Sequence, residues 1–297
     1  MKLGLLGLGQ MGKPMAMNLY KSGAELMVYD VRPDSYPEFA AKGISTASAF
    51  ADFADCDIVF LSLPDTHIVE KVLLGNDGLL EFLKPGAIVC DLSTIDYMAS
   101  TRIAEACGNK GIDFMDAPVT GMEARAIDGT LTVICGGKPE IYDRLLPYLQ
   151  HIGNNILHMG KHGCGQLSKA INNILFDINI AGVAEILPMA VKLGLDPEKI
   201  GSVINSGSGR SYASEFFIQR ILRNHFADGY PMQHAYKDLI CGADLAAQLC
   251  TPLPVMHAAM TTYQMALLKG LGDQDKGAMV KVFEELLDVQ VRKNAGS

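Results

Sequence analysis

The stretch KLGLLGLGQMG, residues 2–12, carries the strongest fold signal in the chain. The apolar run Lys2–Leu6 leads into a G-x-G-x-x-G pattern, and a helical pattern follows from about Met11 to Ser22. In a strand–turn–helix unit, the first glycine permits a tight turn and the second lets the backbone approach a pyrophosphate. The third glycine allows the helix to pack closely on the strand. Because a helix N-terminus also favours phosphate, we expect a dinucleotide-binding turn formed by Gly7, Gly9, Gln10, Met11 and Gly12.

The next apolar run of the chain ends at Asp30, 18 residues after Gly12. This spacing is close to the ~20 residues at which a carboxylate accepts hydrogen bonds from the adenosine ribose hydroxyls. A carboxylate there repels a ribose 2′-phosphate, so we expect NAD rather than NADP as the cofactor. Arg32 lies two residues further on and could pair with that phosphate, so NADP stays the alternative.

The first half of the chain alternates apolar runs with helical patterns. The runs are Leu26–Tyr29, Ile58–Leu63, Ala87–Asp91, Ile112–Met115 and Thr130–Cys135. Such alternation predicts a mainly parallel, doubly wound sheet, as in an α/β Rossmann-type domain. Beyond about residue 160 only helical patterns follow, and the first is a long helix over 165–194. We therefore expect a dinucleotide-binding domain at 1–161 and an all-α domain for substrate binding and oligomerisation at 162–297, joined by the long helix.

Composition excludes several other classes of protein. Of 297 residues, 49% are hydrophobic and 20% charged, which is the reverse of the balance in disordered chains. A formal charge of -8 with no run of Lys or Arg argues against nucleic-acid binding. Seven cysteines without a C-x-x-C pair indicate reduced thiols. Because neither a signal-peptide pattern nor an uninterrupted apolar stretch of ~18–20 residues is present, we expect a cytoplasmic protein without a membrane partner.

Lys169 and Asn173 stand four residues apart on the expected long helix and so share one of its faces. A lysine beside an apolar stripe most often extends its charged end into solvent. A partly desolvated lysine instead suits proton transfer near neutral pH, and Asn173 would then orient a substrate hydroxyl. The helix pattern by itself leaves both interpretations open.

With these residues the chain resembles the β-hydroxyacid dehydrogenase family, which includes 3-hydroxyisobutyrate dehydrogenase and tartronate semialdehyde reductase. The resemblance runs over essentially the whole chain. Its blocks, in order, are Gly7–Pro14, Asp91–Asp96, Asp116–Gly121 followed by Gly129–Leu131, Gly165–Asn173 as G-x-x-x-K-x-x-x-N, and Lys237–Leu239.

The resemblance implies an oxidoreductase that moves hydride between NAD(H) and the CH–OH group of a small β-hydroxyacid, 3-hydroxyisobutyrate-like, or its semialdehyde. Lys169 would be the general acid/base, with Asn173 as its catalytic partner on the helix. Further cofactor contacts would come from Leu63, Pro64, Thr94 and Lys237. The substrate would meet Ser93, Thr120, Gly121 and Met122 besides Lys169 and Asn173. The resemblance also implies a homodimer or homotetramer.

One segment departs from the family pattern. The substrate segment commonly reads Ser-Gly-Gly, whereas this chain has Thr120-Gly121-Met122. Met122 adds bulk and lacks the freedom of glycine to adopt a positive φ, so we expect a different substrate pocket. Arg125 and Arg210 are candidates for binding a second acidic group, although a helix-capping loop also explains the surroundings of Arg210.

Other interpretations remain beside this one. A non-catalytic dinucleotide sensor would have no need for Lys169 and Asn173 on one face. An imine reductase-like enzyme is a closer alternative, but such enzymes generally lack a lysine at the position of Lys169. His158, His162 and Cys164 lie close in sequence without a second cluster of ligands, so we expect no metal site. The particular β-hydroxyacid, its stereochemistry and the physiological direction stay open.

Overall fold

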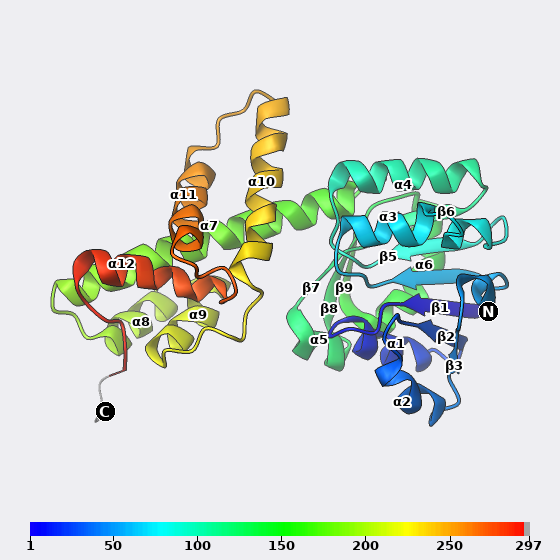
Figure 1. Ribbon diagram of the computed structural model, residues 1–297, viewed down its shortest axis with the longest axis horizontal. Coiled ribbons are helices and arrows are strands. Elements are labelled where there is room, and N and C mark those ends of the chain that lie inside the picture. Colours follow the sequence, from blue (N-terminus) through cyan, green and yellow to red (C-terminus); the bar gives the residue numbers. More distant parts are fainter. Residues whose placement is uncertain (294–297) are drawn as a thin grey trace. The chain divides into compact units, whose positions relative to one another are not determined.

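Parallel strands form the main sheet of the computed structural model, which describes residues 1–293 (Figure 1). Its strand order is β3-β2-β1-β4-β5-β6. The order reverses between β1 and β4, and this is where open α/β sheets bind their ligands. The arrangement confirms the expected Rossmann-type domain. The strands are β1 (Lys2–Leu6), β2 (Glu25–Tyr29), β3 (Ser45–Thr46), β4 (Ile58–Leu61), β5 (Ile88–Asp91) and β6 (Asp113–Asp116).

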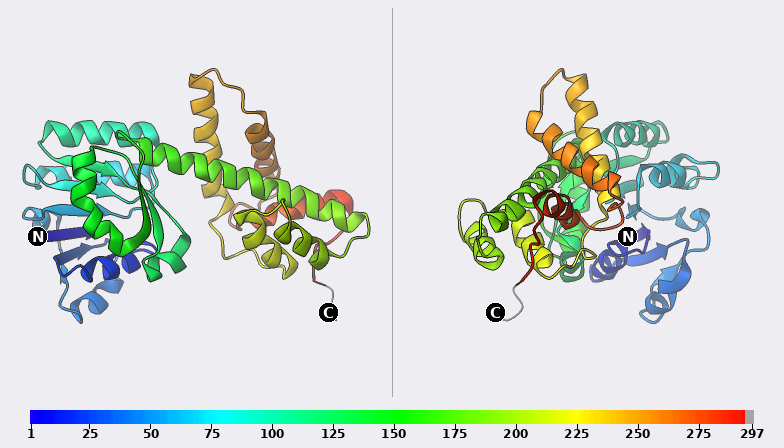
Figure 2. Two further views of the ribbon diagram at one scale, coloured as in Figure 1. Left: turned by 180° about the vertical axis from the view of Figure 1, so that it is seen from behind. Right: turned by 60° about the vertical axis from the view of Figure 1, so that its left-hand side comes forward.

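Helices cover both faces of this sheet (Figures 1 and 2). Phe60 of β4 packs into the apolar layer that includes Met15 and Leu145, whereas its neighbour Val59 packs into the layer that includes Val69 and Ile103. Since both faces are buried, the strands are continuous apolar runs. The covering helices are α1 (Gly12–Tyr20) and α6 (Pro139–Ile152) on one face, and α3 (Thr66–Leu74) and α4 (Tyr97–Asn109) on the other; the short α2 (Tyr36–Ala40) precedes β3.

The expected strand Thr130–Cys135 does not belong to the main sheet, which corrects the single-sheet prediction. It forms β8 (Leu131–Cys135) in a separate sheet, antiparallel to β7 (Val119–Thr120) and parallel to β9 (Gly153–His158). The sequence patterns missed β7 because it is only two residues long, and β9 because it is mostly exposed. The helix α5 (Met122–Asp128) connects β7 to β8.

Internal contacts divide the chain into a first unit, Met1–Lys169, and a second unit from Ala170 onward. The division falls inside helix α7 (Cys164–Lys192), a few residues after the boundary that we expected at 161/162. The second unit is helical, as expected, and buries Ile180, Phe217, Leu239 and Tyr263 in its own core. Its other helices are α8 (Pro197–Ser206), α9 (Tyr212–Leu222), α10 (Met232–Gln248), α11 (Pro254–Leu268) and α12 (Val280–Leu287).

Helix α7 combines two different faces. Among residues 1–293 it is the one helix long and apolar enough to cross a membrane by length and composition, a property that core helices of soluble proteins share. Ile180, Ala184 and Leu187 lie fully buried in the core of the second unit, which accounts for one side. Another row of apolar side chains is exposed, formed by Ile171, Leu175, Ile186 and Met189 of α7 and by Leu193 directly after its end.

Candidate active site

The glycine turn between β1 and α1 has the geometry that its sequence predicts. Gly7 has a φ of +95°, and a Cβ at this position would lie 2.1 Å from the carbonyl oxygen of Ser62. A Cβ on Gly12 would lie 1.9 Å from the carbonyl oxygen of Gly7. At Gly9, by contrast, no atom of the described residues lies within 4 Å of an added Cβ. Gly7 and Gly12 are therefore required by packing, whereas the space at Gly9 is free for a pyrophosphate.

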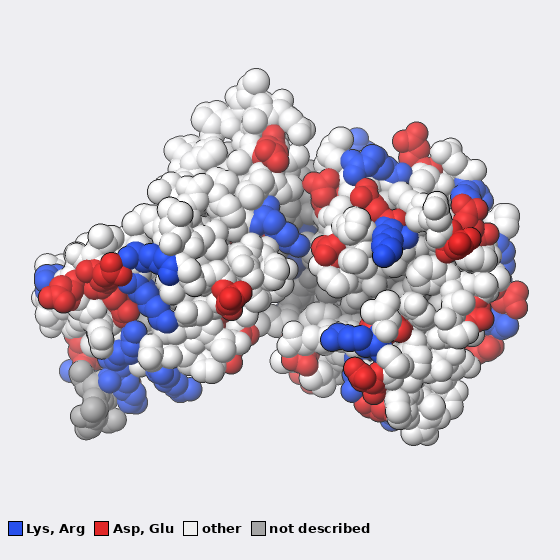
Figure 3. Space-filling view, in the orientation of Figure 1, with Lys and Arg blue, Asp and Glu red and all other residues white. Residues whose placement is uncertain are grey.

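The N-terminus of α1 suits an anion. Within the described chain, no side chain hydrogen-bonds this helix end at Met11, and the first turn holds no acidic residue. The Lys13 N–H already donates to the Gly9 carbonyl oxygen at 3.0 Å and Pro14 has no N–H, so the positive dipole end is what this helix offers a ligand. Figure 3 shows that Lys and Arg are interspersed with Asp and Glu on the visible face of the first unit, so local groups at this turn would supply the attraction for phosphate.

Asp30 is held at the end of β2 beside the same turn. One carboxylate oxygen accepts a hydrogen bond from the Leu8 N–H at 2.6 Å, and the other accepts from the Arg32 N–H at 2.8 Å. The Tyr36 hydroxyl accepts from the Asp30 N–H. The carboxylate is therefore oriented by the turn that would hold the pyrophosphate, as its predicted role in ribose binding requires.

The loops after β4 and β5 are linked through Ser93. Its hydroxyl oxygen accepts from the Leu63 N–H at 2.9 Å, and its own N–H donates to Asp91 at 3.0 Å. Asp91 is fully buried, and burial raises its pKa to about 7 against the hydrogen bonds from Ser93. Pro64 is exposed and Thr94 half-buried on these loops. β4 ends at Leu61, so Leu63 and Pro64 lie in the loop and not at the end of the strand as expected.

The segment Thr120–Met122, which the sequence predicts to bind substrate, contains a backbone conformation that we did not expect. Gly121 has a φ of +139° and Met122 a φ of +64°, so the methionine adopts the left-handed region in spite of its side chain. Such a conformation costs roughly 1 kcal/mol or more for a residue other than glycine. The Gln10 side chain donates to Glu123 at 2.7 Å, which links the cofactor turn to this segment.

The start of α7 is hydrogen-bonded to the ends of the strands by Asp116 and Gln166, two residues of the motif blocks to which the sequence gave no role. The Asp116 carboxylate, at the end of β6, accepts from the N–H groups of Gly163 and Gln166 at 2.7 and 3.0 Å. Burial raises the pKa of Asp116 to about 6, against these hydrogen bonds. Gln166 contacts the loop of Ser93, and Lys169 follows one turn later, half-buried. Since these partners lie 47 to 73 residues apart, no local pattern reveals them.

Within the second unit, Asn173 is held by a carboxylate. Its Nδ2 donates to Asp238 on α10 at 2.9 Å. The adjacent Lys237 is exposed. Arg210, in the turn before α9, forms an ion pair with Glu215 at 3.1 Å, and Arg125 lies exposed on α5. The sequence suggested Lys237 through its motif but gave no role to Asp238, whose partner stands on another helix.

Comparison with known proteins places this geometry in a family. A family model described as the NAD binding domain of 6-phosphogluconate dehydrogenase matches residues 2–160. A second, described as NAD-binding of NADP-dependent 3-hydroxyisobutyrate dehydrogenase, matches residues 163–283. The 2-(hydroxymethyl)glutarate dehydrogenase of Eubacterium barkeri is 36% identical over 292 residues, which cover 98% of this chain and 97% of the relative. The chain belongs to the β-hydroxyacid dehydrogenase family.

Two further relatives agree with this membership. The 2-hydroxy-3-oxopropionate reductase of Escherichia coli (strain K12) is 33% identical over 286 residues, covering 96% of this chain and 97% of its own length. A crystal structure of 3-hydroxyisobutyrate dehydrogenase from Salmonella typhimurium superposes with a TM-score of 0.85 at 28% identity, covering 95% of this chain and 99% of that one. Membership confirms that the protein is an oxidoreductase with a dinucleotide-binding domain, whereas the roles of its individual residues stay predictions.

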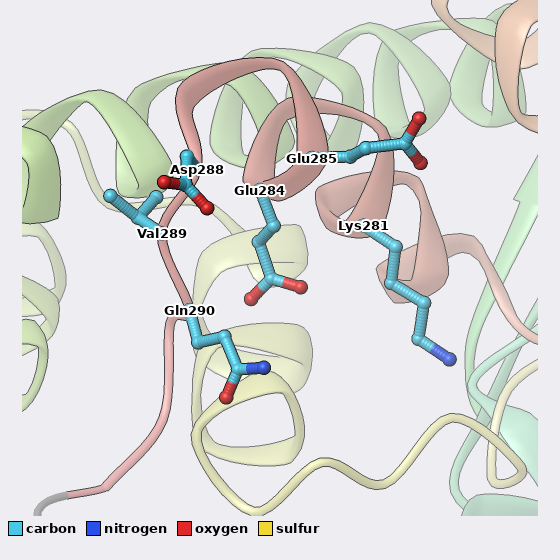
Figure 4. A pocket seen from close by; sticks show the side chains of 6 residues that line it. All are labelled: Lys281, Glu284, Glu285, Asp288, Val289 and Gln290. Carbon is cyan, nitrogen blue, oxygen red and sulfur yellow. The ribbon is translucent and has the colours of Figure 1, made fainter.

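The second unit of this β-hydroxyacid dehydrogenase also has a hollow of about 410 Å³ (Figure 4). Its lining consists of Lys281, Glu284, Glu285, Asp288, Val289 and Gln290. None of the predicted site residues is among them, and three carboxylates around one ammonium group are a poor match for an anionic cofactor or substrate. The glycine turn, the loops after β4 and β5 and the start of α7, and not this hollow, therefore stay the candidate active site.

Proposed function

We propose that the protein catalyses reversible hydride transfer between NAD(H) and the CH–OH group of a small β-hydroxyacid, 3-hydroxyisobutyrate-like, or its semialdehyde. The observation that carries this proposal is the polar face of α7. Lys169 and Asn173 stand one turn apart on this helix, and Asp238 fixes the amide of Asn173. A dinucleotide sensor would not need that pair.

NAD would be held by the turn Gly7–Gly12 and by Asp30, and it would supply the acceptor for hydride from the alcohol carbon, or the donor of hydride to the carbonyl carbon in the reverse direction. In oxidation, the neutral Lys169 Nζ takes the hydroxyl proton as the C–H bond breaks and the carbonyl forms; in reduction, the ammonium returns that proton. Asn173 orients the substrate oxygen. Ser93 and the amides of residues 120–122 hold the substrate carboxylate, and Lys237 adds positive potential beside it.

Removing the Lys169 amine tests the proposal. We expect Lys169→Ala to lower kcat by about 10²–10⁴-fold with little change in the Kd for NAD, because the glycine turn is untouched. Nicotinamide absorbance with a panel of mono- and dicarboxylic 3-hydroxyacids measures kcat, and calorimetry measures Kd. Near-full kcat in the variant would refute the acid–base role. A wild-type protein that binds NAD but oxidises no acid in the panel would favour the sensor.

NAD is the proposed cofactor, with NADP less favoured. The support is the Asp30 carboxylate, which Leu8 and Arg32 amides hold at the end of β2. We expect the wild type to bind NAD more tightly than NADP, and Asp30→Ala to reduce the preference by about tenfold, since the repulsion of the 2′-phosphate is removed. Equal affinities of the wild type for both cofactors would contradict this assignment.

We further propose a homo-oligomer, a dimer or a tetramer, in the cytoplasm, with no nucleic-acid or membrane partner. The exposed apolar row along α7 supports association, because such a row on a soluble protein usually marks an interface. The tip between α10 and α11 also carries exposed Leu249 and Val255, and the second unit is mostly uncharged there (Figure 3). All seven cysteines in the described chain are free thiols, as a reducing compartment favours. Light scattering gives the mass in solution.

A further inference from the structure

The side-chain amide of Gln166, on the first turn of α7, bonds the backbone on both sides of Thr94. Its Nε2 donates to the carbonyl oxygen of Ser93 at 2.7 Å, and its Oε1 accepts from the Ile95 N–H at 3.0 Å. These two hydrogen bonds, which we call the Gln166 bridge, use a donor and an acceptor of one planar group. A glutamine satisfies this pair of backbone groups, whereas an apolar or a fully ionised side chain does not.

Burial makes the bridge more than a surface contact. Gln166 is 2% exposed, and Ser93 is 4% exposed. Buried amide and carbonyl groups left without a partner cost free energy, so the loop is held in the one arrangement that satisfies both. The Ser93–Ile95 loop is thus positioned by α7 and not only by the strand that precedes it.

The first turn of α7 is itself fixed at the strand ends. The Asp116 carboxylate accepts from the N–H groups of Gly163 and Gln166. A Cβ on Gly165 would lie 2.3 Å from the carbonyl oxygen of Ile134 and 2.7 Å from the Asp116 carboxylate. The glycine that opens the G-x-x-x-K-x-x-x-N motif therefore allows the helix to approach β8 and brings Gln166 within reach of the loop.

We infer that Gln166 is a positioning residue for the proposed reaction. It fixes the position of the Ser93–Thr94 loop relative to Lys169, one helical turn away. The loop residues proposed to contact the substrate and the nicotinamide are thereby positioned as well. The inference rests on the proposed function of Lys169, Ser93 and Thr94. Gln166 itself performs no chemistry. Because a misplacement of about 1 Å costs on the order of 10²-fold in rate, loss of the bridge would lower turnover without disturbing the glycine turn.

The first test replaces the amide by an apolar side chain of similar length. We expect Gln166→Met to lower kcat/KM for the hydroxyacid by about 10–100-fold while the Kd for NAD changes by less than about threefold, because the adenine end binds elsewhere. Ser168→Ala is the matched control, since the Ser168 hydroxyl donates to the Cys164 carbonyl oxygen within the same helix. A Gln166→Met enzyme with kcat/KM within about twofold of the wild type would overturn the inference.

A second variant tests the pH dependence of kcat/KM, which a purely structural role of Gln166 would leave unchanged. In Gln166→Glu the ionised carboxylate cannot donate to Ser93, but the protonated acid can. The titratable groups on neighbouring elements are Asp91, Asp96, Asp116 and His162, with Lys169 further along α7. We expect kcat/KM relative to the wild type to rise at least about threefold between pH 8 and pH 6, and the Gln166→Met ratio to stay flat. A ratio for Gln166→Glu that stays low at every pH would overturn the inference, even if Gln166→Met fails to fold, because the protonated acid restores the donor to Ser93.

Hydrogen exchange separates failure of the inference from failure of the proposed function. Loss of the bridge is expected to speed exchange at the Ile95 amide in the Gln166→Met protein, whichever substrate the enzyme uses. Faster exchange with a wild type that oxidises no hydroxyacid would refute the proposed function and support the bridge. Unchanged exchange at Ile95 would overturn the bridge whatever the activity.

Discussion

The cofactor turn, Gly7–Gly12, and the substrate turn, Thr120–Met122, both follow a strand and open a helix, but they place positive φ differently. In the cofactor turn the left-handed residue is Gly7, where no side chain opposes it. In the substrate turn Met122 takes a φ of +64° directly after Gly121. The first turn has the glycine geometry that is usual for dinucleotide-binding turns. The second retains an unfavourable backbone under a large side chain.

The largest expected effect is on the cofactor turn. Gly12→Ala puts a methyl group where the Gly7 carbonyl oxygen stands, so β1 and α1 must separate. We expect a loss of roughly 3 kcal/mol or more in the free energy of unfolding, together with loss of NAD binding. Urea unfolding measures the first quantity and calorimetry the second. A variant as stable as the wild type would contradict the packing role of Gly12.

Gly9→Ala sharpens the comparison inside the same turn. An added methyl group meets open space in the protein but would meet the pyrophosphate. We expect the Kd for NAD to rise by about tenfold, near 1.4 kcal/mol, while the free energy of unfolding stays within about 0.5 kcal/mol. If NAD affinity were unchanged, the pyrophosphate would not lie at Gly9.

The loop after β5 is held by the buried Asp91 carboxylate, whereas the cofactor turn depends on glycines. This difference predicts that the free energy of unfolding depends on pH through Asp91. The folded-state pKa of Asp91, about 7, lies above its usual 3.8, so the native state binds the proton more tightly. Its stabilising contribution is complete below pH 4 and is lost as the pH rises towards 7. We expect Asp91→Asn to flatten the fall of unfolding free energy between pH 4 and 7 by up to about 1 kcal/mol per pH unit. If the free energy of unfolding of Asp91→Asn and of the wild type depended on pH in the same way, the raised pKa of Asp91 would be contradicted.

The smallest effect is expected at the substrate turn. Met122→Gly relieves the left-handed strain but adds entropy to the unfolded chain, so we expect a net gain of about 0.5 kcal/mol. Removing the side chain is also expected to raise kcat/KM for 3-hydroxyacids with bulkier 2-substituents. Met122→Leu keeps both the strain and most of the bulk and is the matched control. A Met122→Gly enzyme with the wild-type order of substrate preference would remove Met122 from the selectivity argument.

Local patterns predicted a large part of the fold. The alternation of apolar runs and helices indicated the Rossmann-type sheet, and the G-x-G-x-x-G spacing located its first turn. Lys169 and Asn173 share a face because helix geometry requires it at a separation of four. The sheet of β7, β8 and β9 escaped prediction, since β7 is two residues long and β9 is largely exposed.

The sequence by itself determined the prediction of which residues bind the cofactor and carry the chemistry: the glycines, Asp30, Lys169 and Asn173 are chosen from residue type and short spacing. Only the tertiary structure decided what holds them. Gln166 meets a loop 73 residues away and Asn173 meets Asp238 65 residues away. The positive φ of Met122, +64°, likewise appears only in the folded chain. The physical reason is that backbone periodicity acts over a few residues, whereas buried polar groups take partners from whichever segments the fold brings together.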